Sequence, residues 1–420
     1  MEAAFVSAGG LGCAGVRTAV SLRGQTVPLS AAAAPFVRAR AAVAAACRNV
    51  TRVQGAGAAQ MSATFRSEQK DVVVITGSSS GLGLEAAKEL AATGDWLVVM
   101  AVRSFAKAEK AMREANINPE NYRVMSLDLA SLTSVRQFVD ELKSFLSRAR
   151  LDLNALVCNA AVWYPKDKKP RFTADGFEEH VGTNHLGHFL LAHLLVSDLH
   201  KSAKTGLSPR LVFIGTETHN PDSIAGKVPP QADLGQLQGL LKGLGEEAPM
   251  IDGKKFEPTK AYKDSKVCNA ITMKQMSDRY SPRGVVVSAL FPGCVASSGL
   301  FREKRGWFNS FFPWFQKNIT KQYVTTQEAG HRLASVVANP LYSTSGAYWK
   351  WNSLKLGVGK MDVVGTNIAI SQQARDEKVA GVLYEKSAEL VGINPTPKSK
   401  SLPEPATEIE RQVRSANAMR

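Results

Sequence analysis

Short apolar runs rich in Val, Ile and Leu alternate along the chain with longer segments whose apolar residues recur at helical spacing. The runs that predict strands lie at 71–76, 96–101, 122–127, 155–158, 210–215, 285–290 and 346–350. Helical spacing is found at about 84–92, 105–115, 131–147, 174–200, 325–338 and 370–391, and in a segment through Tyr262 that ends near 281. This alternation predicts an α/β fold, a Rossmann-type doubly wound parallel sheet of about seven strands with helices on both faces.

The first 67 residues differ in composition from the rest of the chain. Residues 3 to 67 contain no Asp or Glu and carry seven arginines. A segment rich in Ala, Ser and Arg without acids is typical of an organellar transit peptide. We therefore expect residues 1–67 to be a plastid transit peptide plus flexible linker, 68–394 to be a single Rossmann-fold domain, and 395–420 to be a flexible polar tail. A disordered basic arm is the alternative interpretation of the front segment.

The net charge of +15 would suggest binding to nucleic acid or to an anionic membrane surface, so its position along the sequence matters. Without residues 1–67 the chain has 45 basic and 36 acidic residues, a net charge of +9, and the basic residues form no stripe. We therefore expect no nucleic-acid partner. No later stretch reaches the 18 or more uninterrupted apolar residues of a membrane span. Cys158, Cys268 and Cys294 have irregular spacing, which predicts neither a disulfide framework nor a zinc site and fits a reducing compartment.

A glycine-rich turn follows the first strand. Gly77, Gly81 and Gly83 are spaced so that the backbone can approach a diphosphate, whose charge is met by the N-terminus of the next helix. The turn therefore predicts dinucleotide binding, with a structural strand-to-helix turn as the alternative. The other residues of the turn predicted to bind the cofactor are Ser79, Ser80 and Leu82.

Arg103 and Lys107 follow the second strand, where NAD-binding folds usually offer an acid to the ribose hydroxyls. Their positive charge favours the 2′-phosphate of NADP, with a solvated basic loop as the alternative. After the third strand, Asp128 with Leu129 is placed either to accept a hydrogen bond from an adenine amine or to lie in the N-cap region of the following helix. Both interpretations of Asp128 stay open at this point.

Polar residues also lie within and beside the later elements. Asn159 and Ala160 follow the fourth strand, and Thr216 places a hydroxyl at the end of the fifth. Asn184 in an otherwise apolar helix needs a hydrogen-bonding partner. The same helix carries three histidines without an acid or cysteine at ligand spacing, so we predict packing or surface roles and no metal site. These histidines are His185, His188 and His193.

Tyr262 and Lys266 stand four residues apart, so on a helix both side chains lie on one face. A neighbouring ammonium favours the phenolate, which lowers the pKa of a tyrosine from its ordinary value of about 10. The pair thus predicts a proton donor, although a plain surface helix is the simpler interpretation of the pair alone. The residues on either side of this helix include a long Gly- and Pro-rich insertion at 217–258 and an aromatic segment at 300–323, both predicted to lie near a substrate site.

The order of these motifs resembles the short-chain dehydrogenase/reductase family: Thr-Gly-xxx-Gly-x-Gly, Asn-Ala-Ala, an asparagine on the long helix and Tyr-xxx-Lys, over residues 71–300. A narrower resemblance, over 71–352, is to the light-dependent NADPH:protochlorophyllide oxidoreductases. Its segments are Val157-Cys-Asn-Ala-Ala, Asn184-His-Leu-Gly-His-Phe-Leu, Val228-Pro-Pro-Gln-Ala-Asp-Leu-Gly, Ala261-Tyr-Lys-Asp-Ser-Lys-Val-Cys-Asn, Pro292-Gly-Cys-Val-Ala and Gly299-Leu-Phe-Arg-Glu.

The narrower resemblance implies NADPH as the cofactor and protochlorophyllide as the substrate, reduced at its C17–C18 double bond under light in chlorophyll biosynthesis. It also implies a plastid or chloroplast location, in the stroma or on thylakoid-type membranes, a homo-oligomer, and peripheral association with membrane lipids. An ordinary light-independent NADPH carbonyl reductase of retinoids or lipids is the alternative enzyme, and a non-catalytic pigment-binding scaffold is the alternative outside catalysis.

The resemblance also implies roles for single residues. Tyr262 would supply a proton, Lys266 would bind the nicotinamide ribose and tune Tyr262, and Asn184 would support a proton-relay water. Thr216 stands where the wider family usually has serine and keeps a hydroxyl. Cys294 would lie near the pigment, where its thiol would place the substrate or compete with Tyr262 as proton donor.

Overall fold

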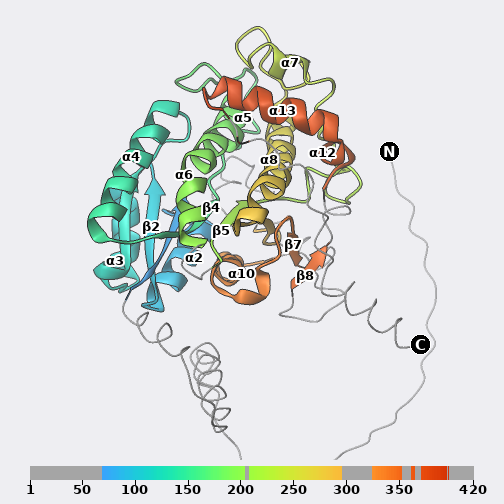
Figure 1. The fold of residues 1–420 in the computed structure, drawn as a ribbon. Helices are drawn as coiled ribbons and strands as arrows, with labels where there is room; N and C mark the ends of the chain where they lie inside the picture. Colours follow the sequence, from blue (N-terminus) through green and yellow to red (C-terminus); the bar gives the residue numbers. More distant parts are fainter. Residues whose placement is uncertain are drawn as a thin grey trace, which may run out of the picture. The chain divides into compact units, whose positions relative to one another are not determined.

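The computed structural model describes residues 69–203, 208–295, 324–351, 361–364, 370–394 and 396. One sheet runs through this part of the chain in the order β3-β2-β1-β4-β5-β6-β7-β8 (Figure 1). The strands are β1 (Asp71–Thr76), β2 (Trp96–Val102), β3 (Tyr122–Ser126), β4 (Leu153–Cys158), β5 (Arg210–Ile214), β6 (Val286–Phe291), β7 (Tyr348–Trp351) and β8 (Met361–Val364).

The first seven strands are parallel, as the alternating pattern predicts. β1 is a central strand because its β-branched run Val72 to Ile75 is fully buried on both faces of the sheet. The chain order reverses between β1 and β4, which makes their carboxyl ends the switch point where ligands bind in doubly wound sheets. β8 adds an antiparallel eighth strand beside β7.

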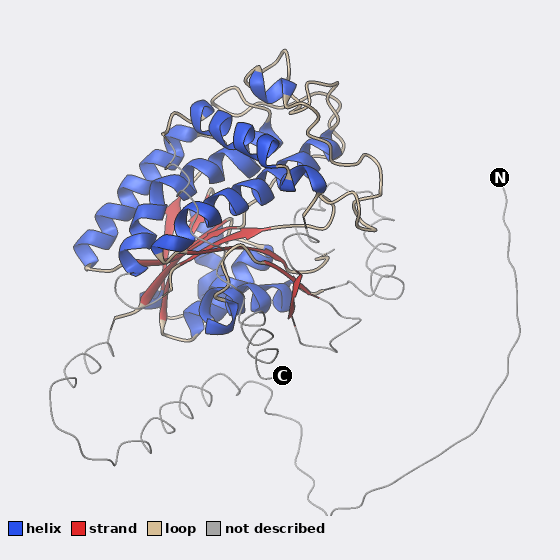
Figure 2. Ribbon diagram, turned by 45° about the vertical axis from the view of Figure 1, so that its right-hand side comes forward, coloured by secondary structure: helices blue, strands red, loops and turns tan. Residues whose placement is uncertain are grey.

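Helices cover both faces of the sheet, as Figure 2 shows. The buried apolar residues of one face pack against α4 (Leu132–Ala149), α6 (Gly187–Ala203), α8 (Pro258–Tyr280) and α13 (Glu377–Leu390). Those of the other face pack against α2 (Gly81–Ala92), α3 (Phe105–Glu114) and α10 (Thr326–Ala338). At Gly330 of α10, an added Cβ would lie 2.4 Å from the Cβ of Glu85, so α10 and α2 pack closely because this glycine has no side chain.

Two helices differ from the periodicity-based prediction. The helix predicted from about 174 begins with α5 (Glu179–Val181) and passes through a π-helical segment at Gly182–Leu186 before α6. Apolar periodicity does not register the one extra residue of a π turn, and such turns often occur at functional sites. The helix predicted at 370–391 is two helices, α12 (Gln372–Arg375) and α13, because Asp376 leaves the helical conformation and caps the second of them.

Several predicted segments lie outside the described residues: the transit segment 1–67, the aromatic segment 300–323 and most of the tail 395–420. The insertion 217–258 is described, and it is mostly turns with one short helix, α7 (Gln238–Leu241). Among the described helices, none combines the length and apolar character needed to cross a lipid bilayer.

Candidate active site

The glycine turn joins β1 to α2 at the switch point of the sheet. Gly77 and Gly81 have positive φ angles of 67° and 60°, which glycine adopts without strain. An added Cβ at Gly83 would lie 2.5 Å from Nδ2 of Asn159, whereas one at Gly81 would meet no atom within 4 Å. Gly83 therefore lets Asn159 pack against the helix start, and Gly81 leaves open space in front of it. No side chain caps α2, whose N-cap residue is Ser80. The turn fits a bound diphosphate.

Thr76 connects the glycine turn to the segment after β4. Its Oγ1 accepts hydrogen bonds from the backbone N–H groups of Asn159 at 2.9 Å and Ala160 at 3.0 Å. The Nδ2 of Asn159 donates to the Thr76 carbonyl at 2.7 Å. The backbone of Asn159 and Ala160 is thus held beside the predicted cofactor site by Thr76, the first residue of the Thr-Gly-xxx-Gly-x-Gly motif, to which the sequence analysis gave no role of its own.

His188 extends this network to the π-helical segment. Its Nδ1 donates to the carbonyl of Asn184 at 3.0 Å, so its Nε2 accepts from the Thr76 hydroxyl at 2.9 Å. Burial lowers the pKa of His188 to about 4, which keeps the ring neutral. The other two histidines of the predicted trio bond to the C-terminal helix: His185 to Ser387 and His193 to Tyr384.

Asn184 finds the partners that its burial requires. Its side-chain Oδ1 accepts from the N–H of Val162 at 2.8 Å, and its Nδ2 donates to the Val162 carbonyl at 3.0 Å and to Ser265 Oγ at 3.1 Å. Its main-chain carbonyl also accepts from Nδ2 of Asn269 at 3.0 Å. Asn184 therefore joins the loop after β4 to α8.

Tyr262 and Lys266 are both buried on α8, which begins at Pro258 after the N-cap residue Glu257. The Nζ of Lys266 donates to the carbonyl of Ile214 at 3.1 Å and lies 6.0 Å from the centroid of the Tyr262 ring. Burial lowers the pKa of Lys266 to about 8. Burial also raises the pKa of Tyr262, and a charged Cys294 nearby would raise it further.

The predicted lowering of the Tyr262 pKa is therefore wrong. An adjacent cation was expected to lower the phenol pKa, but desolvation dominates and raises it. The phenol is consequently protonated at neutral pH, which is the state that a proton donor needs.

Cys294 is half-buried just after β6. Burial, and after it the charge of Glu217, raises the pKa of the Cys294 thiol to about 12, so the thiol is also protonated at neutral pH. Thr216 lies at the end of β5, and its hydroxyl is 3.1 Å from that of Thr218. Its carbonyl accepts from the hydroxyl of Tyr348 at 2.9 Å.

The remaining predicted cofactor residues lie around the same edge of the sheet. Arg103 follows β2 directly, and Lys107 lies on the first turn of α3, both exposed. The Oδ1 of Asp128 accepts from the N–H of Ala130 at 3.0 Å, while the N-cap residue of α4 is Ser131. Asp128 thus shapes the turn that precedes α4 without capping it.

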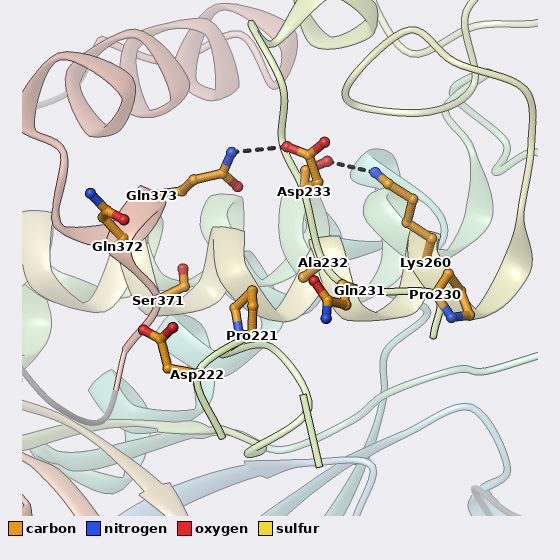
Figure 3. A pocket seen from close by; sticks show the side chains of 10 residues that line it. All are labelled: Pro221, Asp222, Pro230, Gln231, Ala232, Asp233, Lys260, Ser371, Gln372 and Gln373. Carbon is orange, nitrogen blue, oxygen red and sulfur yellow. Dashed lines mark hydrogen bonds between the residues drawn. The ribbon is translucent and has the colours of Figure 1, made fainter. Parts of the chain in front are cut away.

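A cavity of about 520 Å³ lies between the insertion and α12 (Figure 3). None of its lining residues is a predicted catalytic or cofactor residue: Pro221, Asp222, Pro230, Gln231, Ala232, Asp233, Lys260, Ser371, Gln372 and Gln373. Its wall is held by Lys260, whose Nζ contacts Asp264 at 2.5 Å and Asp252 at 2.9 Å. Because Lys260 and Asp264 belong to α8, these contacts dock the insertion on the helix that carries Tyr262.

Residues 71–218 match the sequence model of a family described as short chain dehydrogenase. The solved structure of gox2181 shares the fold with a TM-score of 0.50 at 16% identity, covering 67% of this chain and 94% of that one. The doubly wound sheet with its glycine turn and Tyr-xxx-Lys helix places the chain in the class of short-chain dehydrogenases/reductases, which are oxidoreductases.

Three curated relatives narrow this class. The chain is 50% identical over 328 residues to the chloroplastic protochlorophyllide reductase of Chlamydomonas reinhardtii, covering 78% of this chain and 79% of the relative. It is 51% identical to the chloroplastic enzyme of Cucumis sativus, with coverage of 77% and 79%. It is also 51% identical to protochlorophyllide reductase of Avena sativa, with coverage of 77% and 100%. The chain belongs to the protochlorophyllide reductase family.

Proposed function

We propose that this protein reduces the C17–C18 double bond of protochlorophyllide with NADPH, under light absorbed by the bound pigment, as a step of chlorophyll biosynthesis in the plastid. The observation that carries the proposal is the buried Tyr262–Lys266 pair on α8. It occurs in a chain that is 50% identical to a protein named protochlorophyllide reductase. Family membership also supports a chloroplast location, because the relatives are chloroplastic.

The chain's own residues divide the work of the reaction. The chemistry that NADPH would supply when bound is a hydride for one carbon of the double bond. Tyr262 donates its phenolic proton to the other carbon, so that one hydride and one proton together saturate the bond. Its raised pKa keeps that proton available at neutral pH. Lys266 lies beside the Tyr262 ring, where it would bind the nicotinamide ribose and return a proton to the phenolate.

Three further groups would support this reaction. Asn184 would support a water that relays protons, and Cys294 would place the pigment beside Tyr262. Thr216 would line the site through its hydroxyl. A ring alkene has no carbonyl oxygen to polarise, so the family's usual serine is not required at position 216.

The glycine turn, with Asn159 and Ala160, would hold the cofactor diphosphate and ribose, and Asp128 with Leu129 would contact the adenine side. Arg103 and Lys107 supply the cationic pair that supports NADPH over NADH. In a comparison of the two cofactors, the variant Arg103→Ala should lose affinity for NADPH selectively. Equal loss for NADPH and NADH would contradict the assignment.

The proposed reaction is tested by an absorbance spectrum of the purified protein with NADPH and protochlorophyllide, before and after one flash. A red-shifted product band that forms only after the flash supports the proposal. Turnover of an aldehyde in the dark, without a flash-dependent product, would instead show a carbonyl reductase. Pigment binding without either product would show a scaffold.

We further propose that the protein forms homo-oligomers and associates peripherally with plastid membrane lipids.

A further inference from the structure

The indole of Trp163 stacks on the ring of Tyr262. The two ring centroids are 5.5 Å apart and the ring planes are inclined by 30°. Trp163 lies in the loop that follows β4, four residues after Asn159. Its neighbours Val162 and Tyr164 are buried, and Trp163 is partly exposed. Aromatic side chains in offset stacks hold each other in a preferred orientation. The proposed proton donor therefore has a fixed aromatic neighbour.

The loop that carries Trp163 is fixed on both sides of the indole. On one side, both backbone groups of Val162 bond to the side chain of Asn184. On the other, the N–H of Tyr164 donates to Nε2 of His180 at 3.1 Å. His180 is oriented in turn by its Nδ1, which donates to the fully buried carboxylate of Glu178 at 2.6 Å.

Tyr262 is fixed by the same asparagine. The Nδ2 of Asn184 donates to Ser265 Oγ at 3.1 Å, and that hydroxyl donates to the carbonyl of Tyr262 at 2.6 Å. One buried amide thus connects the backbone next to Trp163 with the turn of α8 that carries Tyr262. Hydrogen bonds therefore hold the two chain segments that carry the stacked rings.

We propose that Trp163 is a positioning residue for Tyr262: its indole fixes the plane of the phenol, and the Asn184 side chain holds both partners in register. The terminal torsion of a tyrosine is broad when unconstrained, so a stacked ring restricts the directions in which the hydroxyl can point. A proton donor is effective only while its hydroxyl faces the accepting carbon. The inference rests on the proposed function, because it concerns the proton-transfer step.

The test compares Trp163→Ala and Trp163→Phe with the wild type in flash-initiated turnover. Loss of an aromatic stack should lower kcat roughly tenfold in Trp163→Ala. Trp163→Phe, which keeps a ring, should stay within about twofold of the wild type. In Trp163→Ala, the rate should become more sensitive to replacing H₂O with D₂O, while the effect of NADPH deuterated at the transferred hydride should not increase. KM for the pigment should change less than kcat.

Trp349→Ala is the matched control, because Trp349 is a buried tryptophan of β7 outside the proposed site. Its ring centroid lies 4.9 Å from that of Tyr342. This variant should lose stability without changing either isotope effect. The inference is overturned if Trp163→Ala keeps the wild-type kcat and solvent isotope effect, or if its hydride isotope effect rises instead.

A pigment-independent measurement separates this inference from the proposed function. Thermal midpoints of Trp163→Ala, Tyr262→Ala and the double variant form a double-mutant cycle. Coupling between the rings predicts that the double variant loses less than the two single losses combined. Additive losses would overturn the inference even if the pigment is reduced normally. Absence of a flash product from the wild type would count against the proposed function alone.

Discussion

The ammonium of Lys266 donates to the main-chain carbonyl of Ile214 and lies 6.0 Å from the centre of the Tyr262 ring. The lysine is anchored to the end of β5, and both side chains are buried. Burial affects the two groups in opposite senses: it lowers the pKa of Lys266 and raises that of Tyr262. Each shift favours the uncharged form of its group, so Tyr262 keeps its phenolic proton at neutral pH and Lys266 loses its own near pH 8.

The buried ammonium makes stability depend on pH. The pKa of Lys266 is about 8 in the folded protein and 10.5 ordinarily, so between these values the unfolded chain binds more protons. The contribution of Lys266 to stability therefore rises with pH across this window, and its full penalty is present below pH 8. Between pH 8 and pH 10.5, the difference in the free energy of unfolding between the wild type and Lys266→Met should rise by on the order of 3 kcal/mol in favour of the wild type. Chemical denaturation at several pH values measures this difference, and a flat profile would contradict a desolvated ammonium.

Replacing Tyr262 by Phe should lower flash-driven product formation by about a hundredfold or more, because the general acid is lost. NADPH affinity, measured by fluorescence titration, should change little. Tyr280→Phe is the control, because Tyr280 lies on the same helix and its hydroxyl donates to Thr396 Oγ1 at 2.9 Å. If Cys294→Ala is the more damaging variant and Tyr262→Phe remains active, the thiol delivers the proton.

Gly83→Ala should weaken NADPH binding. The new Cβ would lie 2.5 Å from Nδ2 of Asn159 and displace the amide that bonds to the Thr76 carbonyl. Gly381→Ala provides a control on α13, where an added Cβ meets no atom within 4 Å. Since alanine is the better helix former, this control should gain up to about 1 kcal/mol in the free energy of unfolding and keep its NADPH affinity. Undiminished NADPH affinity in Gly83→Ala would argue against the glycine turn as the cofactor site.

Lys260→Met should destabilise the protein by about 3–5 kcal/mol, because it removes the buried cation that contacts the buried carboxylates of Asp252 and Asp264. Lys254 also contacts Asp252, at 3.6 Å, but its side chain is 66% exposed. Lys254→Met should therefore cost no more than about 1 kcal/mol. Urea denaturation measures both variants. Similar losses in the two would show that the α8 contacts do not hold the insertion.

Much of the fold could be predicted because local sequence carries it. The β-branched run Val72 to Ile75 specifies a strand wherever it is buried, and a positive φ is accessible to Gly77 and Gly81 without strain. The helix boundaries at α3 and α10 agree with the prediction to within a residue or so because their periodicity is regular. The π-helical segment at Gly182–Leu186 could not be predicted, because the bonds that Asn184 makes within it go to Val162 and Ser265, which are distant in sequence.

Some features of the candidate site could likewise be predicted from the sequence, and others could not. The sequence by itself determined the alternation of strands and helices, the glycine and polar residues that follow the strands, and the i, i+4 spacing of Tyr262 and Lys266. Each of these depends only on residues that are close in the sequence. Only the tertiary structure decided the sign of the tyrosine's pKa shift, the Thr76–His188–Asn184 network and the Trp163–Tyr262 stack. Desolvation and contacts between distant segments exist only after the chain is folded, and here desolvation sets the direction of the Tyr262 pKa shift.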